Sequence, residues 1–218
     1  MAVSPSSLVY VSGMSDLFDL DWSRGRLTIK RALDCLLTCV LAVVFLPLML
    51  LCAAIIRLSS RGPVLLRQTR LGKNGKPFAM LKLRTMYVDA EANSGPVRAS
   101  HCDQRVLPAC RWMRRSHLDE IPQLINVLAG KMSLVGPRPE RPEIAQEIYQ
   151  RLPEFRRRLQ VRPGITGLAQ VRNGYDTCMD AIRHKLQYDL EYIRRRSWLL
   201  EVGILLRTLT KFYDPSAR

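Results

Sequence analysis

Two adjacent carboxylates, Asp119 and Glu120, follow an arginine-rich stretch of the chain that ends at His117. Positive potential from arginines and from the N–H groups at a helix start keeps a carboxylate ionised and attracts phosphate. An ionised aspartate can act as a nucleophile toward phosphorus. Such an attack brings like charges together, at a cost of about 4 kcal/mol at 4 Å and an effective dielectric of 20. The pair therefore predicts phosphoryl-transfer chemistry if cations lie near, although Asp followed by Glu is also an ordinary helix start.

Basic side chains beside strand, proline or glycine residues are the candidates to offset that repulsion. Lys82 and Arg84 fall in a predicted strand, while Arg138 and Arg162 stand next to prolines. A Mg²⁺ ion could serve the same purpose. Most basic residues of a chain with a net charge of +15 are merely solvated, so residue type alone does not select these four.

A membrane element precedes these residues. Residues 35–56 form an uncharged run, about 33 Å long as a straight helix, which would cross a hydrocarbon core of about 30 Å. Arginine and lysine flank the run on both sides, so the positive-inside rule places both ends in the cytoplasm. Pro47 therefore predicts a helix-break-helix that enters and leaves by the same leaflet. A kinked single span is the alternative, because membrane helices tolerate proline.

The rest of the chain predicts a mostly helical α+β domain. Residues 64–68 and 78–83 flank a glycine-rich turn and predict a small strand pair. Apolar residues from 118 to 128 repeat at helical spacing, with Asp119 as N-cap and Pro122 in the first turn. Residues 135–139 and 162–167 predict rigid loops. Residues 140–159 predict a basic helix, and residues 176–212 predict an amphipathic helix that could lie against the domain or the bilayer surface.

Composition bounds the partners. The 218 residues are 47% hydrophobic and suit one medium domain beyond the membrane segment. We expect an N-terminal arm (1–26), a re-entrant membrane helix (27–60) and a catalytic domain with interfacial helices (61–218). The charge of +15 implies anionic partners, and the absence of a nucleic-acid-binding motif favours lipid headgroups and phosphorylated substrates over nucleic acid. Six cysteines without C-x-x-C spacing indicate reduced thiols.

Several ordered motifs make the chain resemble the small monotopic polyprenyl-phosphate phosphoglycosyl transferases, a group of bacterial sugar transferases. The resemblance runs from about residue 30 to residue 210. It is specific because it consists of long motifs in a fixed order. The motifs are KLRTM at 82–86, LDEIPQL at 118–124, NVL at 126–128, MSLVGPRP at 132–139 and RPGITG at 162–167.

The resemblance implies a reaction and a location. A sugar-1-phosphate would pass from a UDP-sugar to undecaprenyl phosphate, giving undecaprenyl-diphosphate-sugar and UMP, as the first membrane step of polysaccharide or glycoconjugate synthesis. The family uses a re-entrant membrane helix, Mg²⁺ and a covalent intermediate. The chain would be a monotopic protein of the bacterial inner membrane with its catalytic domain on the cytoplasmic face, in contact with membrane lipid, and it could pair as a homodimer.

The same resemblance assigns roles to individual residues. Asp119 would attack the β-phosphorus, and Glu120, together with Asp119, would hold Mg²⁺. Lys82 and Arg138 would neutralise phosphate. The remaining candidates for phosphate or substrate binding are Arg84, Arg162 and Asp189. From the residues alone, Asp189 also fits a solvated helix face.

Three departures from the family pattern are His117, Lys131 and Leu168, and none touches the carboxylate pair. Two other functions stay open. A glycosyltransferase that releases UDP would need an Asp-x-Asp metal site, matched only at residues 19–21 of the arm. A basic membrane-associated scaffold or lipid-binding protein would need no catalysis. The sequence does not select the sugar, and we expect residues 170–180 to form a variable loop near it.

Overall fold

The computed structural model describes residues 24–88, 90, 103–172 and 178–210. The predicted N-terminal arm up to residue 23, with its Asp-x-Asp motif, lies outside the described residues, as do positions 173–177 of the predicted sugar loop. Within the described ranges the protein is mostly helical, with two small sheets. This confirms the predicted mixture of helices with a small strand pair.

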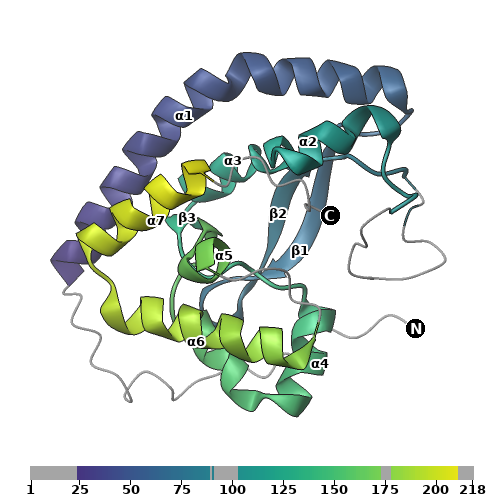
Figure 1. The fold of residues 1–218 in the computed structure, drawn as a ribbon. Helices are drawn as coiled ribbons and strands as arrows, with labels where there is room; N and C mark the ends of the chain where they lie inside the picture. The colour runs from purple at the N-terminus through teal and green to yellow at the C-terminus, as the bar shows by residue number, and fades with distance from the viewer. Residues whose placement is uncertain (1–23, 89, 91–102, 173–177, 211–218) are drawn as a thin grey trace.

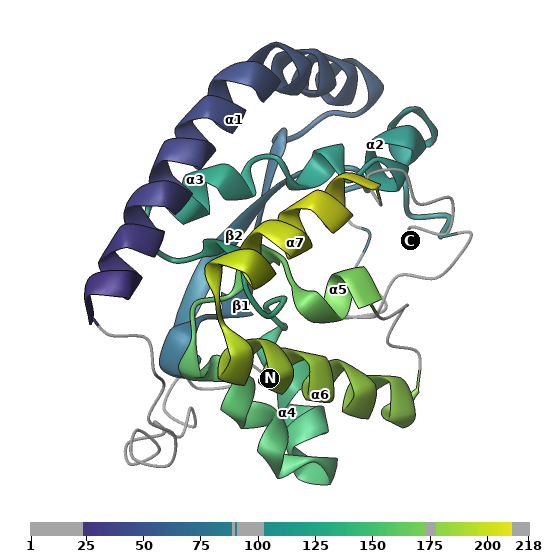
Figure 2. The ribbon, with the colours of Figure 1, turned by 60° about the vertical axis from the view of Figure 1, so that its left-hand side comes forward.

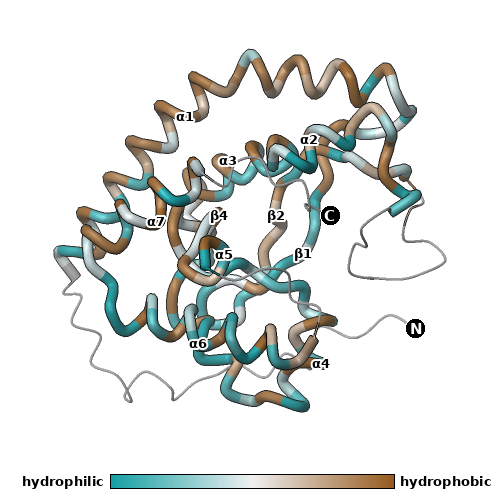
Figure 3. Tube along the Cα trace, viewed as in Figure 1, coloured by the Kyte–Doolittle hydropathy of each residue, from teal (hydrophilic) through white to brown (hydrophobic). Residues whose placement is uncertain are grey.

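The longest element is α1 (Arg24–Ser59), which arches over one side of the domain (Figure 1). Its surface is apolar along most of its length (Figure 3). Among the described residues it is the one helix long and apolar enough to cross a membrane. The helix changes direction along its course but continues through Pro47, so the predicted break is a bend. Proline removes one intrahelical hydrogen bond and clashes with the preceding turn, which bends a helix without ending it.

Both halves of α1 are attached to the same domain. Before Pro47, Arg31 donates from Nη1 to the carbonyl of Val127 (2.6 Å) and from Nη2 to that of Leu128 (2.9 Å). Arg31 thus caps the C-terminus of the helix that ends at Leu128. After Pro47, Cys52 and Ile56 are fully buried in an apolar cluster. The other buried members of this cluster are Leu83, Leu107, Cys110, Met113 and Leu118.

The predicted hairpin is present. Strands β1 (Leu65–Leu71) and β2 (Pro77–Leu83) pair antiparallel, with Gln68 opposite Met80. A short 3₁₀ turn η2 (Lys73–Gly75) joins them, with Asn74 and Gly75 at positive φ. The hairpin runs past α3 (Gln123–Leu128; Figure 2). Lys82 lies near the open end of the hairpin, opposite Leu66.

A second sheet was not predicted. Strands β3 (Ser133–Val135) and β4 (Gly164–Thr166) pair in parallel where the sequence predicts only rigid loops. Each has three residues bounded by proline and glycine, so neither leaves a recognisable alternating pattern. The two backbones approach closely beside Gly136, where an added Cβ would lie 2.6 Å from the carbonyl oxygen of Arg162. This proximity fixes the loop that carries Arg138.

The helical predictions are correct in type but too long. The predicted helix from 118 to 128 is a 3₁₀ turn, η4 (Leu118–Glu120), followed by α3 (Gln123–Leu128). The predicted helix 140–159 is α4 (Pro142–Arg151) followed by η5 (Pro153–Gln160), because Pro153 disfavours a helical Leu152. The predicted helix 176–212 divides near Ser197. The remaining helices are η3 (Pro108–Cys110), α2 (Arg111–Arg115), α5 (Leu168–Arg172), α6 (Met179–Arg195) and α7 (Trp198–Thr210).

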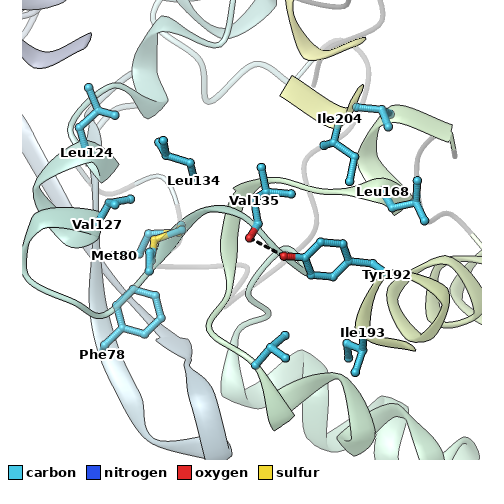
Figure 4. Packing of buried hydrophobic residues seen from close by; sticks show 13 residues of the cluster. Phe78, Met80, Leu124, Val127, Leu134, Val135, Leu168, Tyr192, Ile193 and Ile204 are labelled. Carbon is cyan, nitrogen blue, oxygen red and sulfur yellow. Dashed lines mark hydrogen bonds between the residues drawn. The ribbon is translucent and has the colours of Figure 1, made fainter. Parts of the chain in front are cut away.

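The main core lies between β2, α3, β3, α6 and α7 (Figure 4). Met80 and Val127 pack on one side of it, and Leu168 and Ile204 pack on the other. Tyr192 crosses the core and donates its hydroxyl to the carbonyl of Val135 (3.0 Å). Strand β3, and hence the loop that follows it, is therefore held on both faces.

Candidate active site

The carboxylate pair lies in the 3₁₀ turn η4 between α2 and α3. His117 enters this turn in the left-handed region (φ 53°), and its carbonyl accepts the N–H of Glu120 (3.1 Å). Asp119 makes no capping hydrogen bond and sits inside the turn, so its prediction as an N-cap is wrong. The reason is Pro122, whose ring excludes a helical hydrogen bond at that position and delays α3 until Gln123.

Glu120 is held by two cations. Lys82 Nζ lies 2.7 Å from Oε1, and Arg138 donates from Nη1 to Oε2 (3.0 Å) and from Nη2 to Oε1. Burial alone would raise the pKa of Glu120, but Arg138 and Lys82 outweigh burial and hold that pKa well below its usual value. Glu120 is therefore ionised, and it fixes Lys82 and Arg138 in place.

Asp119 is 9% exposed, like its neighbour, but its surroundings differ. Among the described residues its carboxylate forms no hydrogen bond and no ion pair. Burial raises the pKa of Asp119 although Lys82 opposes this, and the charge on Glu120 raises it further. The turn thus holds one carboxylate bound by two cations and one that has no hydrogen bond or ion pair among the described residues. Both lie beside a Lys82 ammonium whose own pKa is lowered by burial.

Asp119 also lies close to the membrane helix. Its neighbour Leu118 is buried in the same apolar cluster as Cys52 and Ile56 of α1. Cys52 also lies near Asp119 itself. The candidate nucleophile is thus beside the second half of α1.

Two predicted phosphate ligands are placed elsewhere. Arg84 is buried and donates from Nη1 to the carbonyl of Arg61 (2.9 Å) and from Nη2 to that of Ser60 (3.0 Å), so it binds the C-terminal end of α1. Arg162 is exposed and lies near Lys73, whose pKa is lowered mainly by burial and further by Arg162. Neither guanidinium is among the groups that contact Glu120 in the described part of the chain.

Asp189 lies on α6 and is only 1% exposed, so the alternative of a solvated helix face is wrong. It pairs with Arg158, whose Nε and Nη2 lie 2.9 Å and 2.7 Å from Oδ2. Burial raises the pKa of Asp189 although Arg158 and Lys185 oppose the shift. The side chain is directed to Arg158 and makes no contact with Glu120.

Four further charged residues around this site could not be identified from local sequence patterns. Glu140 pairs with Lys185 (2.5 Å) and lies within 4 Å of a guanidinium nitrogen of Arg158 and of Arg70. Burial would raise the pKa of Glu140, but Lys185 and Arg158 lower it to about 2. Burial lowers the pKa of Arg70 to about 10. The paired residues lie 18 to 70 positions apart in the chain, a separation that no local pattern can indicate.

The donor set suits a cation shared with a substrate. Within the described ranges, no three His, Cys, Asp or Glu side chains gather into a metal cage. Mg²⁺ is commonly held by one or two carboxylates together with substrate phosphates and water. Asp119, with its unengaged oxygens, and Glu120 beside it fit that mode of binding.

The three departures from the family pattern have structural positions but add no ligand to the site. His117 sets the left-handed start of η4, Lys131 is exposed after α3, and Leu168 is buried in the main core. Arg114 belongs to the arginine-rich stretch that was predicted to give positive potential at the carboxylates. Its Nη1 lies 3.5 Å from Thr85 Oγ1, and its charge opposes the rise in the pKa of Asp119.

Comparison with known proteins identifies a family and several relatives. Residues 25–214 match the family model described as bacterial sugar transferase. A UDP-glucose:undecaprenyl-phosphate glucose-1-phosphate transferase of Caulobacter vibrioides is 44% identical over 182 residues, covering 83% of this chain and 68% of that protein. A second relative, from Aeromonas hydrophila, is 40% identical, and the match covers 83% of this chain and 43% of that protein. It is described as a UDP-N-acetylgalactosamine-undecaprenyl-phosphate N-acetylgalactosaminephosphotransferase. The exopolysaccharide production protein PSS of Rhizobium leguminosarum is 37% identical, and the match covers 84% of this chain and 94% of that protein. The chain thus spans about two thirds of the Caulobacter protein and less than half of the Aeromonas one.

Proposed function

Because the chain belongs to the bacterial sugar transferase family, we propose that it transfers a sugar-1-phosphate from a UDP-sugar to undecaprenyl phosphate. The products are undecaprenyl-diphosphate-sugar and UMP, and the reaction is the first membrane step of polysaccharide or glycoconjugate synthesis. The observation that carries this proposal is an Asp119 carboxylate that has no ion-pair partner in the described part of the chain, beside a Glu120 held by Lys82 and Arg138.

The reaction proceeds in two displacements at one phosphorus atom. In the first, a carboxylate oxygen of Asp119 attacks the β-phosphorus of the UDP-sugar, and the bond to the bridging oxygen breaks with its electron pair going to UMP. A phosphosugar-aspartyl enzyme results. In the second, an oxygen of undecaprenyl phosphate attacks the same phosphorus and Asp119 leaves. No proton has to be removed from either nucleophile, so no general base is needed.

The fixed cations stabilise charge that accumulates on the phosphate. Lys82 and Arg138 are oriented by Glu120 before substrate arrives, so they need little reorganisation during the reaction. Asp119 and Glu120 would hold Mg²⁺ together with the diphosphate, where the ion neutralises phosphate charge. Glu120 stays ionised throughout because the pKa of its carboxyl is held low.

The membrane helix supplies access to the lipid substrate. We propose that α1 is re-entrant and that the chain is a monotopic protein of the bacterial inner membrane, with the domain on the cytoplasmic face. The support is that both halves of α1 are tied to one domain, by Arg31 before the bend and by Cys52 and Ile56 after it. A straight span would place the two ends of α1 on opposite sides of the bilayer, where one domain could not contact both halves. Undecaprenyl phosphate would then reach Asp119 along the second half of α1.

The deciding experiment identifies the released nucleotide. Purified protein in nanodiscs receives Mg²⁺, undecaprenyl phosphate and, in turn, UDP-glucose, UDP-galactose and their N-acetylated counterparts. We expect UMP from the wild type and none from Asp119→Asn, which is isosteric but cannot attack. Glu147→Gln, a carboxylate-to-amide change at an exposed position of α4, is the matched control and should retain full turnover.

Other outcomes support the rival functions. Release of UDP would mean that only the sugar is transferred, and no nucleotide from any donor would favour a scaffold or lipid-binding protein. The covalent intermediate has its own readout: without lipid acceptor, intact-protein mass should rise by the mass of one phosphosugar, and the adduct should map to Asp119. An unmodified enzyme that still releases UMP would contradict the two-step mechanism.

A further inference from the structure

The loop that carries Arg138 is held by its backbone. All four carbonyl oxygens of residues 137–140 accept a hydrogen bond from outside the loop. Such complete occupancy leaves the loop little freedom to shift. In chain order the donors are Gly164 N (3.0 Å), Arg158 Nη2 (2.7 Å), Arg70 Nη1 (3.1 Å) and Leu71 N (2.9 Å).

One of these donors is a buried side chain with a second partner. Arg158 is 3% exposed, and the Nη2 atom that reaches the carbonyl of Arg138 also lies 2.7 Å from Asp189 Oδ2. Its Nε donates to the same carboxylate oxygen at 2.9 Å. Because a guanidinium is planar and rigid, the position of Asp189 fixes the direction in which Arg158 points. Asp189 thereby acts on the backbone of Arg138 from α6.

We propose that Asp189 is a positioning residue for the transfer reaction, which orients Arg158 so that Arg158 fixes the Arg138 backbone and directs the Arg138 side chain to Glu120. This inference rests on the proposed function and deepens it. It differs from the sequence-based prediction of a substrate ligand, because Asp189 acts through two arginines and touches no substrate. A buried ion pair contributes little net stability but can specify one arrangement, which suits a positioning role.

A double-mutant cycle tests whether Asp189 acts through Arg138. Asp189→Asn keeps an oxygen that can accept from Arg158 but removes the charge that holds it. A side chain displaced by about 1 Å can lower a rate by up to about 100-fold, so we expect a 10- to 100-fold fall in kcat for UMP release. In an Arg138→Ala background, Asp189→Asn should lower kcat by less than about twofold, because the side chain that Asp189 positions has been removed.

The matched control lies two residues away on the same helix. Glu191→Gln removes a carboxylate that pairs with Arg172 (3.1 Å) at the exposed surface, and it should leave kcat unchanged in either background. A loss from Asp189→Asn that is as large without Arg138 as with it would overturn the proposal, since Asp189 would then act by another route.

Amide hydrogen exchange gives a readout that does not depend on turnover. We expect faster exchange in the peptide covering residues 133–141 for Asp189→Asn, with no change for Glu191→Gln. Arg158→Lys, which keeps the charge but loses the planar fork, should give the same result and replaces Asp189→Asn if that variant fails to fold. Unchanged exchange in these variants would overturn the positioning role. A wild type without turnover would refute the proposed function, while the exchange result would still decide whether Asp189 fixes the loop.

Discussion

At the residue scale, neighbouring carboxylates in one 3₁₀ turn are given opposite properties by their surroundings. Glu120 contacts two cations and has a strongly lowered pKa, whereas Asp119 has no direct partner among the described residues and a raised pKa. Environments that separate the pKa values of paired groups commonly divide a catalytic task between them. In the proposed mechanism, Glu120 keeps Lys82 and Arg138 in place and Asp119 attacks the phosphorus.

This separation predicts an acid limb in the pH–rate profile. Asp119 must be ionised to attack, and because the pKa in the folded protein is raised, activity should fall as the pH drops through that raised value. The loss should therefore begin above the range of a free aspartate, near 3.9. Glu120, with a lowered pKa, should not titrate there. UMP release measured between pH 4 and 8 checks this, and full activity maintained down to pH 4 would contradict it.

The fold should survive this loss of activity. Glu140 has a lowered pKa of about 2 in the folded protein, so it contributes stability above its unfolded value of 4.5 and loses that contribution only as the pH falls from there toward 2. Tryptophan fluorescence recorded on the same samples should therefore stay native across the acid limb. An emission change that coincides with the rate loss would mean that unfolding, and not Asp119, limits activity.

Sequence reasoning found part of this site. Long motifs in a fixed order led to the prediction that four residues share the site, and these residues do lie together: Asp119, Glu120, Lys82 and Arg138. Arg84 and Arg162 came from the same kind of motif, yet one binds the end of α1 and the other is exposed. The buried partners of Glu140 were not predicted, because which basic residues are desolvated is decided by the packing of distant elements.

At the element scale, the short parallel pair β3 and β4 is the feature that sequence patterns missed and the one that holds the Arg138 loop. It depends on glycine, because two backbones approach more closely than any side chain permits. A Cβ on Gly164 would collide with the backbone nitrogen and carbonyl oxygen of Gly136. The pair is thus defined by the absence of side chains, whereas strand prediction relies on their alternation.

Gly164→Ala should destabilise the protein for this reason. Overpacking of a rigid region usually costs about 1–3 kcal/mol and sometimes more, and backbone atoms cannot move aside as a flexible side chain would. Gly203→Ala in α7 is the control, because nothing lies within 4 Å of its added Cβ. In a helix that change should stabilise by up to about 1 kcal/mol. Denaturant unfolding in detergent compares the two variants, and equal stability would show that β3 and β4 can separate at no cost.

At the scale of the whole molecule, α1 is an integral part of the fold. A buried polar network adds to the attachments already described: Lys30 Nζ lies 2.6 Å from Glu201 of α7, and Ser133 donates to Asp34 (2.6 Å). The hydrophobic run, its charged flanks and the bend at Pro47 could be read from the sequence. These tertiary attachments could not, because the polar ones join residues about 100 or more positions apart and the apolar ones join residues 27 to 66 positions apart.

The re-entrant topology predicts that both ends of α1 face the cytoplasm. In a cysteine-free variant that retains activity, single cysteines replace Arg26 near one end of α1 and Ser59 at the other. A membrane-impermeant maleimide added to intact spheroplasts should label neither position, and it should label both after lysis. Labelling of one position in intact spheroplasts would show that α1 spans the bilayer and would contradict the proposed topology.

The double attachment of α1 also bears on how the two substrates arrive. A helix tied to its domain on both sides of the bend cannot shift relative to Asp119, so in the proposed re-entrant topology the depth of α1 in the bilayer also sets the distance of Asp119 from the membrane surface. In the proposed reaction the acceptor lipid would then need only a two-dimensional search within one leaflet, while the water-soluble donor would diffuse in from bulk solution. Each substrate would reach the same aspartate from its own phase.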